Sequence, residues 1–251
     1  MKISVITVCR NSARTILDTL ESVRNQTYGD IEHIVCDGGS SDNTVQIVKQ
    51  FDSSDVRLYE QSDEGIYDAI NKGIAHATGD IVAILNSDDF YYNENVLAKV
   101  AAGFESGVDS VYGDLVYVKP EDTTRIVRYW KSGEYAVHKF LWGWTVPHPA
   151  FFIRKPIYDK FGLYSTHFKI SGDYDLILRL LYKNQISTRY IPEVLVKMRT
   201  GGASNGNLGK NIEVNREDYQ AWKNNKISPY FFTLCLKPFR KLGQYLFLKI
   251  K

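Results

Sequence analysis

Two adjacent carboxylates stand where a buried strand is expected to end. Asp88 and Asp89 follow the apolar run of residues 81–85 in the segment IVAILNSDD. Neighbouring carboxylates repel each other unless a cation or several hydrogen-bond donors lie beside them. Mg2+ and Mn2+ prefer oxygen ligands and often bridge protein carboxylates to phosphates. The pair therefore indicates a divalent-metal site, although a cap for a helix after Asn93 would explain the same residues.

Asp37 also stands at an expected strand end, in the segment CDGGSSDNT. The glycines that follow it allow the backbone to approach a ligand closely. Its carboxylate can accept a hydrogen bond from a base N–H or a ribose hydroxyl. A turn followed by a helix N-cap is an equally good explanation. The spacing is not that of the G-x-G-x-x-G dinucleotide fingerprint, and the chain has no G-x-x-x-x-G-K-[ST] phosphate loop.

Asp173 and Asp175 begin an expected helix in the segment SGDYDLILRL. The helix macrodipole favours acidic residues in a first turn, which is the structural explanation for both. The functional explanation makes one of them a general base. Residues two positions apart do not share a helix face, so we expect at most one to face a given site. The other should cap the helix or pair with Arg179.

His148 and Arg199 are two further candidates. His148 lies between two prolines in VPHPAFF, which restrict its backbone, so its ring could contact an acceptor, a metal or a phosphate. A structural histidine is the alternative. Arg199 precedes a glycine-rich stretch that begins at Gly201 and could close over a substrate. An ordinary surface loop would have the same composition.

Elements of two kinds alternate in the first half and position these residues. Short β-branched runs predict strands, and apolar residues at helical spacing between them predict helices. The expected strands cover residues 3–9, 31–36, 56–59 and 81–85, and the helices cover 12–24, 43–51, 66–77 and 94–104. This alternation predicts a doubly wound, mostly parallel sheet. Ligands bind beyond the carboxyl ends of such strands, where Asp37, Asp88 and Asp89 fall.

The second half is less regular. We expect a hairpin over residues 110–118 and 124–130, and one or two strands over 187–197. Helical spacing covers residues 171–181 and 211–222. No linker interrupts the chain before about residue 226, so we predict one domain over residues 1–225 and a tail over 226–251.

Composition narrows the class of protein. The 251 residues are 44% hydrophobic and 24% charged, which is typical of a globular protein. Three scattered cysteines exclude a disulfide framework and suit a reducing compartment. The chain has no apolar run of transmembrane length and no signal-peptide pattern at its start. Seven of the 31 Lys and Arg residues follow Asp218 and none of the 29 acidic residues does. An acidic body with a basic tail argues against a nucleic-acid binder.

These segments together, in this order, resemble a family 2 glycosyltransferase with the GT-A fold. The resemblance rests on SVITVCRN, HIVCDGGSSDNT, DEGIYDAINKGIAHATGD, ILNSDD, HPAFFIRK, GDYDLILRL and MRTGGAS, which extend over residues 4–204. It implies an α/β fold with a Rossmann-like nucleotide-sugar half over residues 1–105 and an acceptor half over 106–225. The branch that it resembles builds bacterial surface polysaccharides of the colanic acid or O-antigen type.

The resemblance also implies roles on the donor side. Val8 and Arg10 would lie near the base, with Arg10 in the place of the usual aromatic residue. Asp37 would contact the base, usually uracil. Asp88 would meet the ribose or a metal-bound water, and Asp89 would hold Mg2+ or Mn2+.

On the acceptor side, the resemblance makes Asp173 the catalytic base. The Glu of the family's Glu-Asp pair is replaced by Gly172, which removes a neighbour that helps to position the acceptor. His148 falls in the acceptor region, and Arg199 falls before a loop that closes on the donor diphosphate.

The implied activity is inverting transfer of a sugar from a nucleoside-diphosphate donor, in particular a UDP-sugar, to a hydroxyl of a glycan or polyprenyl-diphosphate-linked acceptor. Asp89 with its metal would balance the charge of the leaving diphosphate, and Asp173 would take the acceptor proton. The sequence leaves two alternative functions open. A sugar nucleotidyltransferase would need a Gly-rich basic loop after the first strand, where this chain has RNSAR. A catalytically degenerate, membrane-associated scaffold is the non-enzymatic alternative.

The tail has a pattern of its own. Phe239, Leu242, Leu246 and Ile250 recur on one helical face, with basic residues on the other. A basic amphipathic helix can lie in a membrane interface. We therefore expect residues 229–251 to meet the inner-membrane surface from the cytoplasmic side; packing on the body or on a second subunit is the alternative.

Overall fold

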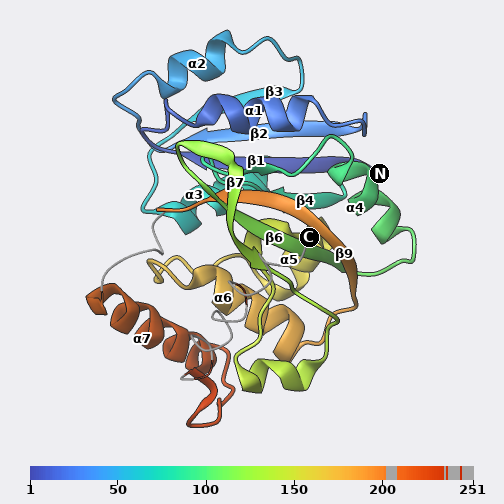
Figure 1. Ribbon diagram of the computed structural model, residues 1–251, viewed down its shortest axis with the longest axis vertical. Helices are drawn as coiled ribbons and strands as arrows, with labels where there is room; N and C mark the ends of the chain where they lie inside the picture. Colours follow the sequence, from blue (N-terminus) through green and yellow to red (C-terminus); the bar gives the residue numbers. More distant parts are fainter. Residues whose placement is uncertain (202–207, 235, 237–243, 245–251) are drawn as a thin grey trace.

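A curled nine-stranded sheet forms the centre of the computed structural model, which describes residues 1–201, 208–234, 236 and 244 (Figure 1). Its main path runs in the order β3-β2-β1-β4-β8-β6-β9-β5, and β7 pairs with β6 off this path. The strands of the first half are β1 (Ile3–Cys9), β2 (Ile31–Asp37), β3 (Val56–Glu60) and β4 (Ile81–Ile84).

These four strands are parallel, as the alternating pattern predicts. Helices cover both faces, because successive side chains of a strand point to opposite sides. On β2, Val35 packs with α1 (Ile16–Arg24) and α2 (Thr44–Gln50). Its neighbour Ile34 packs with α3 (Ile66–His76) on the other face. The sheet is therefore doubly wound, and the predicted helices and strands of the first half are confirmed.

The second half adds strands of mixed direction. β8 (Phe151–Arg154) lies antiparallel between β4 and β6 (Ser110–Lys119), and β6 pairs in parallel with β9 (Thr188–Arg199). β6 also forms the expected hairpin with β7 (Asp122–Trp130). β5 (Phe90–Tyr91) pairs antiparallel with β9. β5 and β8 were not predicted, because each is too short to show a periodic pattern.

α4 (Val96–Phe104) ends the first half and packs against β6 and β9. The helices of the second half are α5 (Lys155–Phe161), α6 (Gly172–Ile177) and α7 (Leu208–Asn224). Two 3-10 turns, η1 (Val137–Trp142) and η2 (His148–Ala150), lie between β7 and β8. The single helix expected over residues 171–181 is instead α6 followed by a π turn, η3 (Leu178–Lys183).

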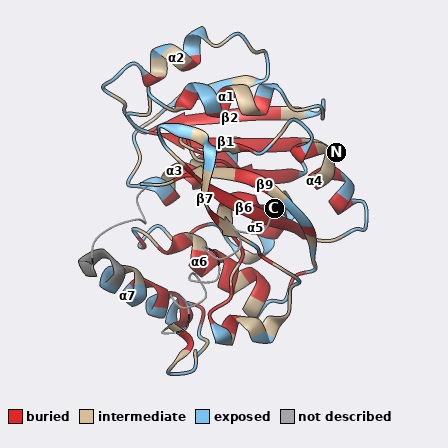
Figure 2. Cartoon of the chain, viewed as in Figure 1, coloured by how far each residue is buried: buried red, intermediate tan, exposed pale blue. Residues whose placement is uncertain are grey.

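Burial is concentrated in the strands of the sheet's centre (Figure 2). β1 is buried along its whole length, and nine of the ten residues of β6 are buried. Strands covered on both faces have continuous apolar runs rather than alternating ones. This is why the apolar segments of the sequence mark the centre of the sheet so clearly.

The tail contacts the body where it is described. Thr233 donates from its hydroxyl to the main-chain carbonyl of Leu141 at 2.7 Å. Arg128 of β7 donates from Nε to the Gln244 side chain at 2.5 Å. Phe239, Leu242, Leu246 and Ile250, on which the amphipathic pattern rests, lie outside the described residues. Within the described residues, no helix is both long enough and apolar enough to span a bilayer.

Candidate active site

The turn after β4 buries one carboxylate and leaves its neighbour partly exposed. Asp89 is completely buried, and Asn86 donates from its side-chain amide to Asp89 Oδ2 at 3.1 Å. Thr19 of α1 donates to the main-chain carbonyl of Asp89 at 2.7 Å. Asp89 Oδ1 makes no hydrogen bond with the described residues. A buried carboxylate oxygen without a partner is rare in folded proteins, so it marks a position where a ligand is expected.

Two acidic side chains, Asp88 and Asp89, lie next to each other in this turn. Burial raises the pKa of Asp89 well above its ordinary value, and the charge of Asp88 raises it further. The Asn86 amide and the main-chain amide of Arg199 favour the charged form but do not reverse the effect. Burial also raises the pKa of Asp88. A divalent cation beside both carboxylates would relieve this unfavourable arrangement.

The two carboxylates suit a metal ion that is completed by substrate. Within residues 1–201 and the described part of the remainder, no three acidic, histidine or cysteine side chains gather at one point. Mg2+ is usually held by one or two carboxylates together with waters and substrate phosphates. Asp88 and Asp89, with the unpartnered Oδ1, fit such a site better than a closed protein cage.

The end of β1 lies beside this turn. The Ser12 and Ser87 hydroxyls are 2.8 Å apart, which joins the segment after β1 to the segment after β4. Arg10 is exposed at the strand end, whereas the Val8 side chain is buried in the core. Only the main chain of Val8 is therefore available to a ligand, while the Arg10 guanidinium is free to reach one.

Asp37 is largely satisfied by its own turn. Its Oδ1 accepts hydrogen bonds from the amides of Gly39 at 3.1 Å and Ser40 at 2.8 Å, and its Oδ2 accepts one from the Ser40 hydroxyl. The turn expected as the structural alternative is thus present. Each carboxylate oxygen has two lone pairs, so the turn does not prevent a further contact with a base.

Asp63 was not singled out from the sequence, yet it lies against the same turn. A Cβ on Gly38 would come within 2.0 Å of Asp63 Oδ2, so only glycine permits this approach. Asp63 Oδ1 also accepts the amide of Gly65, just before α3. The only feature of the sequence that could have identified Asp63 as a site residue is its place at the start of DEGIYDAINKGI, one of the segments that resemble the family.

Asp173 and His148, far apart in the sequence, share one environment. Tyr67 of α3 has its hydroxyl 3.4 Å from Asp173 Oδ1. Tyr164 lies 2.7 Å from His148 Nε2 through its own hydroxyl, and its ring stacks on that of Tyr67. Burial lowers the pKa of His148, while the negative charge of Asp173 opposes this shift. A neutral histidine thus lies near the expected base.

Asp175 has the structural role left open for one member of its pair. It is completely buried and forms an ion pair with Arg179 at 3.3 Å, as anticipated. Asn224 and Asn225 donate to its Oδ1 at 2.7 and 2.9 Å. Asp175 therefore fastens α7 to α6, and Asp173 remains the partly exposed carboxylate.

Arg199, at the end of β9, is attached to the metal-site turn. It donates from Nη1 to the main-chain carbonyl of Asp88 at 2.7 Å and forms an ion pair with Asp18 of α1. Its guanidinium is almost entirely buried. In this arrangement Arg199 supports the turn that carries Asp88.

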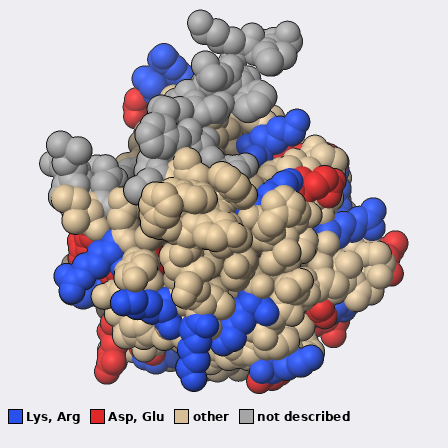
Figure 3. All heavy atoms as spheres, turned by 90° about the horizontal axis from the view of Figure 1, so that it is seen from below, with Lys and Arg blue, Asp and Glu red and all other residues tan. Residues whose placement is uncertain are grey.

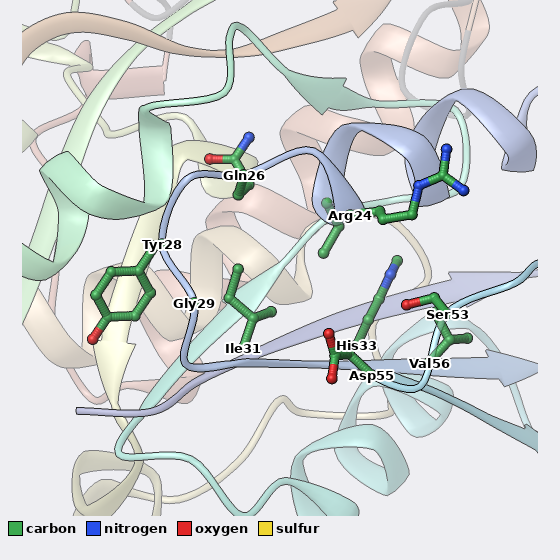
Figure 4. Close-up of a pocket in the computed structure, with 10 residues that line it drawn as sticks. Arg24, Gln26, Tyr28, Gly29, Ile31, His33, Ser53, Asp55 and Val56 are labelled. Atoms are coloured by element: carbon green, nitrogen blue, oxygen red, sulfur yellow. The ribbon is translucent and has the colours of Figure 1, made fainter.

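A separate cavity of about 160 Å³ opens at the opposite edge of the sheet (Figure 4). Residues just before β2 and β3 and at the starts of these strands line it, among them Tyr28, His33 and Asp55. These positions lie at the amino ends of the parallel strands, whereas Asp37 and Asp88 lie beyond the carboxyl ends. The cavity is therefore not part of the site described above.

Comparison with known proteins identifies the family. The sequence profile described as Glycosyl transferase family 2 matches residues 4–162. The chain belongs to glycosyl transferase family 2. A PGL/p-HBAD biosynthesis glycosyltransferase of Mycobacterium bovis is 31% identical to this family member over 208 residues, which are 80% of this chain and 78% of the relative. An uncharacterized glycosyltransferase of Mycobacterium tuberculosis is 36% identical over 179 residues, 70% of this chain and 68% of the relative.

Solved structures support the fold of this family 2 glycosyltransferase. TarS 1-349 of S. aureus, in complex with UDP-GlcNAc, superposes with a TM-score of 0.69 at 19% identity, covering 100% of this chain and 76% of TarS. The mannosyltransferase PcManGT of Pyrobaculum calidifontis, in complex with GDP-Man and Mn2+, gives a TM-score of 0.66 at 20% identity, covering 99% and 70%. The expected GT-A architecture and family are thereby confirmed.

Proposed function

We propose that this family 2 glycosyltransferase moves a sugar, with inversion, from a UDP-sugar to a hydroxyl of a glycan or lipid-linked glycan in bacterial polysaccharide assembly. The observation that carries the proposal is the pair of Asp88, partly exposed, and Asp89, fully buried with an unpartnered Oδ1, beyond the carboxyl ends of the parallel strands. A site of this kind suits a diphosphate and a divalent cation together.

On the donor side, Asp88 and Asp89 would hold Mg2+ or Mn2+. The bound ion supplies positive charge that balances the departing diphosphate. The carboxylates of Asp37 and Asp63 can accept hydrogen bonds only, so they favour a base edge that donates. The exposed Arg10 can stack on the base or meet a phosphate. TarS with UDP-GlcNAc and PcManGT with GDP-Man and Mn2+ support this class of donor.

On the acceptor side, Asp173 would take the proton of the attacking hydroxyl. Its carboxylate is partly exposed, whereas Asp175 two residues later is buried and paired. One carboxylate acting as base on the incoming hydroxyl leads to single displacement and inversion at the anomeric carbon. Neutral His148, near Asp173, would hydrogen-bond the acceptor or donor sugar and help to fix its position.

A lipid-linked acceptor would require a surface that can contact a membrane, and exposed aromatic residues lie at one end of the molecule. Phe231 is 96% exposed, and it lies with Tyr230 and Phe232 beside Trp142 of η1, which is 51% exposed. We call Trp142, Tyr230, Phe231 and Phe232 the aromatic cluster. Seen from this lower end, uncharged surface occupies the middle of the face, and both basic and acidic side chains lie around it (Figure 3).

The charged residues in the two sequence segments that supply the aromatic cluster are all basic. Residues 135–158 and 219–251 contain no acidic residue. Aromatic rings in segments that carry Lys and Arg but no acidic residue suit an anionic lipid surface, in which the rings lie at the headgroup level. We therefore propose that this end, with residues 229–251, meets the cytoplasmic face of the inner membrane, where a polyprenyl-linked acceptor would be found. The body over residues 1–225 would then extend into the cytoplasm.

A ligand screen tests the donor assignment. The melting temperature of the full chain is measured with UDP, GDP, UDP-GlcNAc and GDP-mannose, each with and without Mn2+. A true donor raises the melting temperature by mass action, and we expect the rise to require Mn2+ in the wild type and in Asp173→Asn. Asp89→Ala should lose the response.

Hydrolysis of the same donors then tests the activity, with water in the place of the acceptor. We expect the wild type to release the nucleotide slowly. The rate of hydrolysis by Asp173→Asn and by Asp89→Ala should be lower by at least about 100-fold. A wild-type chain that binds a donor but never cleaves it would favour the scaffold alternative. EDTA without effect on hydrolysis would contradict the metal site.

A further inference from the structure

The start of α6 is held from two sides, and this arrangement bears on the base proposed above. The inference rests on the proposed function, because Asp173 matters here as the group that takes the acceptor proton. α6 has no side-chain cap of its own at Ser171. Two residues from distant parts of the chain, Tyr67 of α3 and Glu217 of α7, instead bond the main chain of residues 169–171 just before the helix.

Tyr67 fills the space beside the base. Its hydroxyl donates to the main-chain carbonyl of Ile170 at 2.5 Å and lies 3.4 Å from Asp173 Oδ1. The ring is 6% exposed and is stacked on Tyr164, with 5.9 Å between the ring centres. The hydroxyl therefore reaches Asp173 from a side chain that has little freedom to move.

Gly172 is the residue that makes this placement possible. A Cβ at position 172 would lie 2.7–2.8 Å from three carbon atoms of the Tyr67 ring. Carbon atoms that are not bonded to each other essentially never come so close in proteins, and a packed ring cannot easily shift. Tyr67 thus occupies the volume that any side chain at position 172 would need.

Glu217 holds the other side of the same segment. Its carboxylate accepts three main-chain hydrogen bonds, from Lys169 at 3.2 Å and from Ile170 and Ser171 at 2.8 Å each. The side chain is 9% exposed. A carboxylate bound to the amides at a helix start also has favourable interaction with the macrodipole.

We propose that Tyr67 and Glu217 are positioning residues that together fix the carboxylate of Asp173 toward the acceptor. Tyr67 holds the Ile170 carbonyl and packs its ring against Gly172, and Glu217 accepts the amides of residues 169–171, so the two residues fix the backbone from which the side chain of Asp173 extends. Displacement of a catalytic group by about 1 Å can reduce a rate by about 100-fold. The nucleotide, which contacts other strand ends, does not depend on either residue.

The test compares Tyr67→Phe with Tyr28→Phe in donor hydrolysis with Mn2+. Both variants remove a tyrosine hydroxyl that donates to a main-chain carbonyl, but Tyr28 bonds Met1 at the opposite edge of the sheet. We expect Tyr67→Phe to lower kcat by about 10-fold or more. Donor KM and the rise in melting temperature with UDP should change by less than about twofold. Tyr28→Phe should leave both kcat and KM unchanged.

A second comparison uses α7. Glu217→Gln is paired with Glu213→Gln, an exposed residue one turn earlier on the same helix. We expect a loss of kcat without a change in donor KM only for Glu217→Gln. An unchanged kcat in Tyr67→Phe, or a loss of kcat matched by an equal rise in donor KM, would overturn the inference.

The Gly172 contact supplies an independent readout. Gly172→Ala should reduce kcat in the wild-type background, where the new methyl group meets the Tyr67 ring. In a Tyr67→Ala background the same substitution should cost little further activity, because the space is open. Additive losses would show that the two residues act separately, against the proposal. A wild-type chain without hydrolysis or transfer would instead overturn the proposed function, and this inference with it.

Discussion

Arg199 donates from Nη1 to the main-chain carbonyl of Asp88 at 2.7 Å, and its guanidinium carbon lies 4.8 Å from the centre of the Phe90 ring. The end of β9 is thereby joined to the turn that carries both carboxylates. Asp18 completes the arrangement by pairing with the same guanidinium. The geometry of the expected metal site thus depends on a residue more than 100 positions away in the chain.

Arg199→Met should therefore damage both the fold and donor binding. The substitution leaves the Asp88 carbonyl without its donor, which we expect to lower the free energy of unfolding by about 2 kcal/mol. Urea unfolding measures this loss, and the melting response to UDP with Mn2+ measures donor binding. Asp18→Asn is the control, because Asp18 is 53% exposed and should cost less than about 1 kcal/mol. Equal losses in the two variants would contradict this interpretation of Arg199.

Asp89→Asn should stabilise the metal-free protein at neutral pH while removing its response to Mn2+. Burial and the charge of Asp88 raise the pKa of Asp89, so between pH 3.8 and that raised pKa the folded state binds more protons than the unfolded state. This group's contribution to stability is therefore lost as pH rises above its ordinary value of 3.8. We expect a gain of about 1 kcal/mol in urea at pH 7. A variant that is less stable than the metal-free wild type would show that the carboxylate is well tolerated without a cation.

His33 should make the fold sensitive to mild acid. Burial lowers the pKa of His33 from 6.5 to about 3, so the folded state keeps the ring neutral while the unfolded state binds a proton. Stability from this group is complete above pH 6.5 and is lost as the pH falls toward 3, at roughly 1.4 kcal/mol per pH unit. Unfolding by urea from pH 7 to pH 4 measures the slope.

The matched variant for this pH effect is His33→Gln, which keeps a polar partner for Thr7, 2.9 Å from His33 Nε2. We expect its stability to change less steeply between pH 6.5 and 4 than that of the wild type. An identical slope would assign the acid sensitivity to groups other than His33.

The aromatic cluster should bind anionic bilayers. Phe231→Ser and Trp142→Ser are each expected to weaken binding to phosphatidylglycerol vesicles by about tenfold, because each removes a ring worth roughly 1.5–3 kcal/mol when fully buried. Sedimentation with the vesicles measures the bound fraction. Leu17→Ser, 44% exposed on α1, is the matched control and should bind as the wild type does. Equal binding to phosphatidylcholine vesicles would show that the basic residues of segments 135–158 and 219–251 do not contribute to binding, against the proposal.

The first half of the fold followed from its sequence because its strands are buried on both faces. Runs such as residues 3–9 and 81–85 leave few alternatives to a central parallel strand. β8 escaped prediction because its four residues, FFIR, are too few to show a periodic pattern within an aromatic-rich stretch. Its antiparallel place between β4 and β6 depends on long-range pairing that no local pattern encodes.

The site could be predicted only in part for a similar reason. Asp88 and Asp89 stand at a strand end, where the parallel topology gives their position a meaning. Tyr67 occupies the first turn of an amphipathic helix and has the pattern of a core residue. Glu217 has that of an acidic residue on a solvated helix. Their relation to Asp173 arises from the packing of α3 and α7 around α6, which becomes visible only in three dimensions.

The first residue of the chain lies at the amino edge of the sheet, where its ammonium group is 3.5 Å from the Asp30 carboxylate. β1 runs from there to the opposite end of the parallel strands (Figure 1), where Asp88 follows the neighbouring strand β4. A fluorophore or biotin attached at Met1 would thus sit at the far end of the strands from the substrates. Chips and beads loaded through that position would therefore present the substrate-binding end of the strands outward.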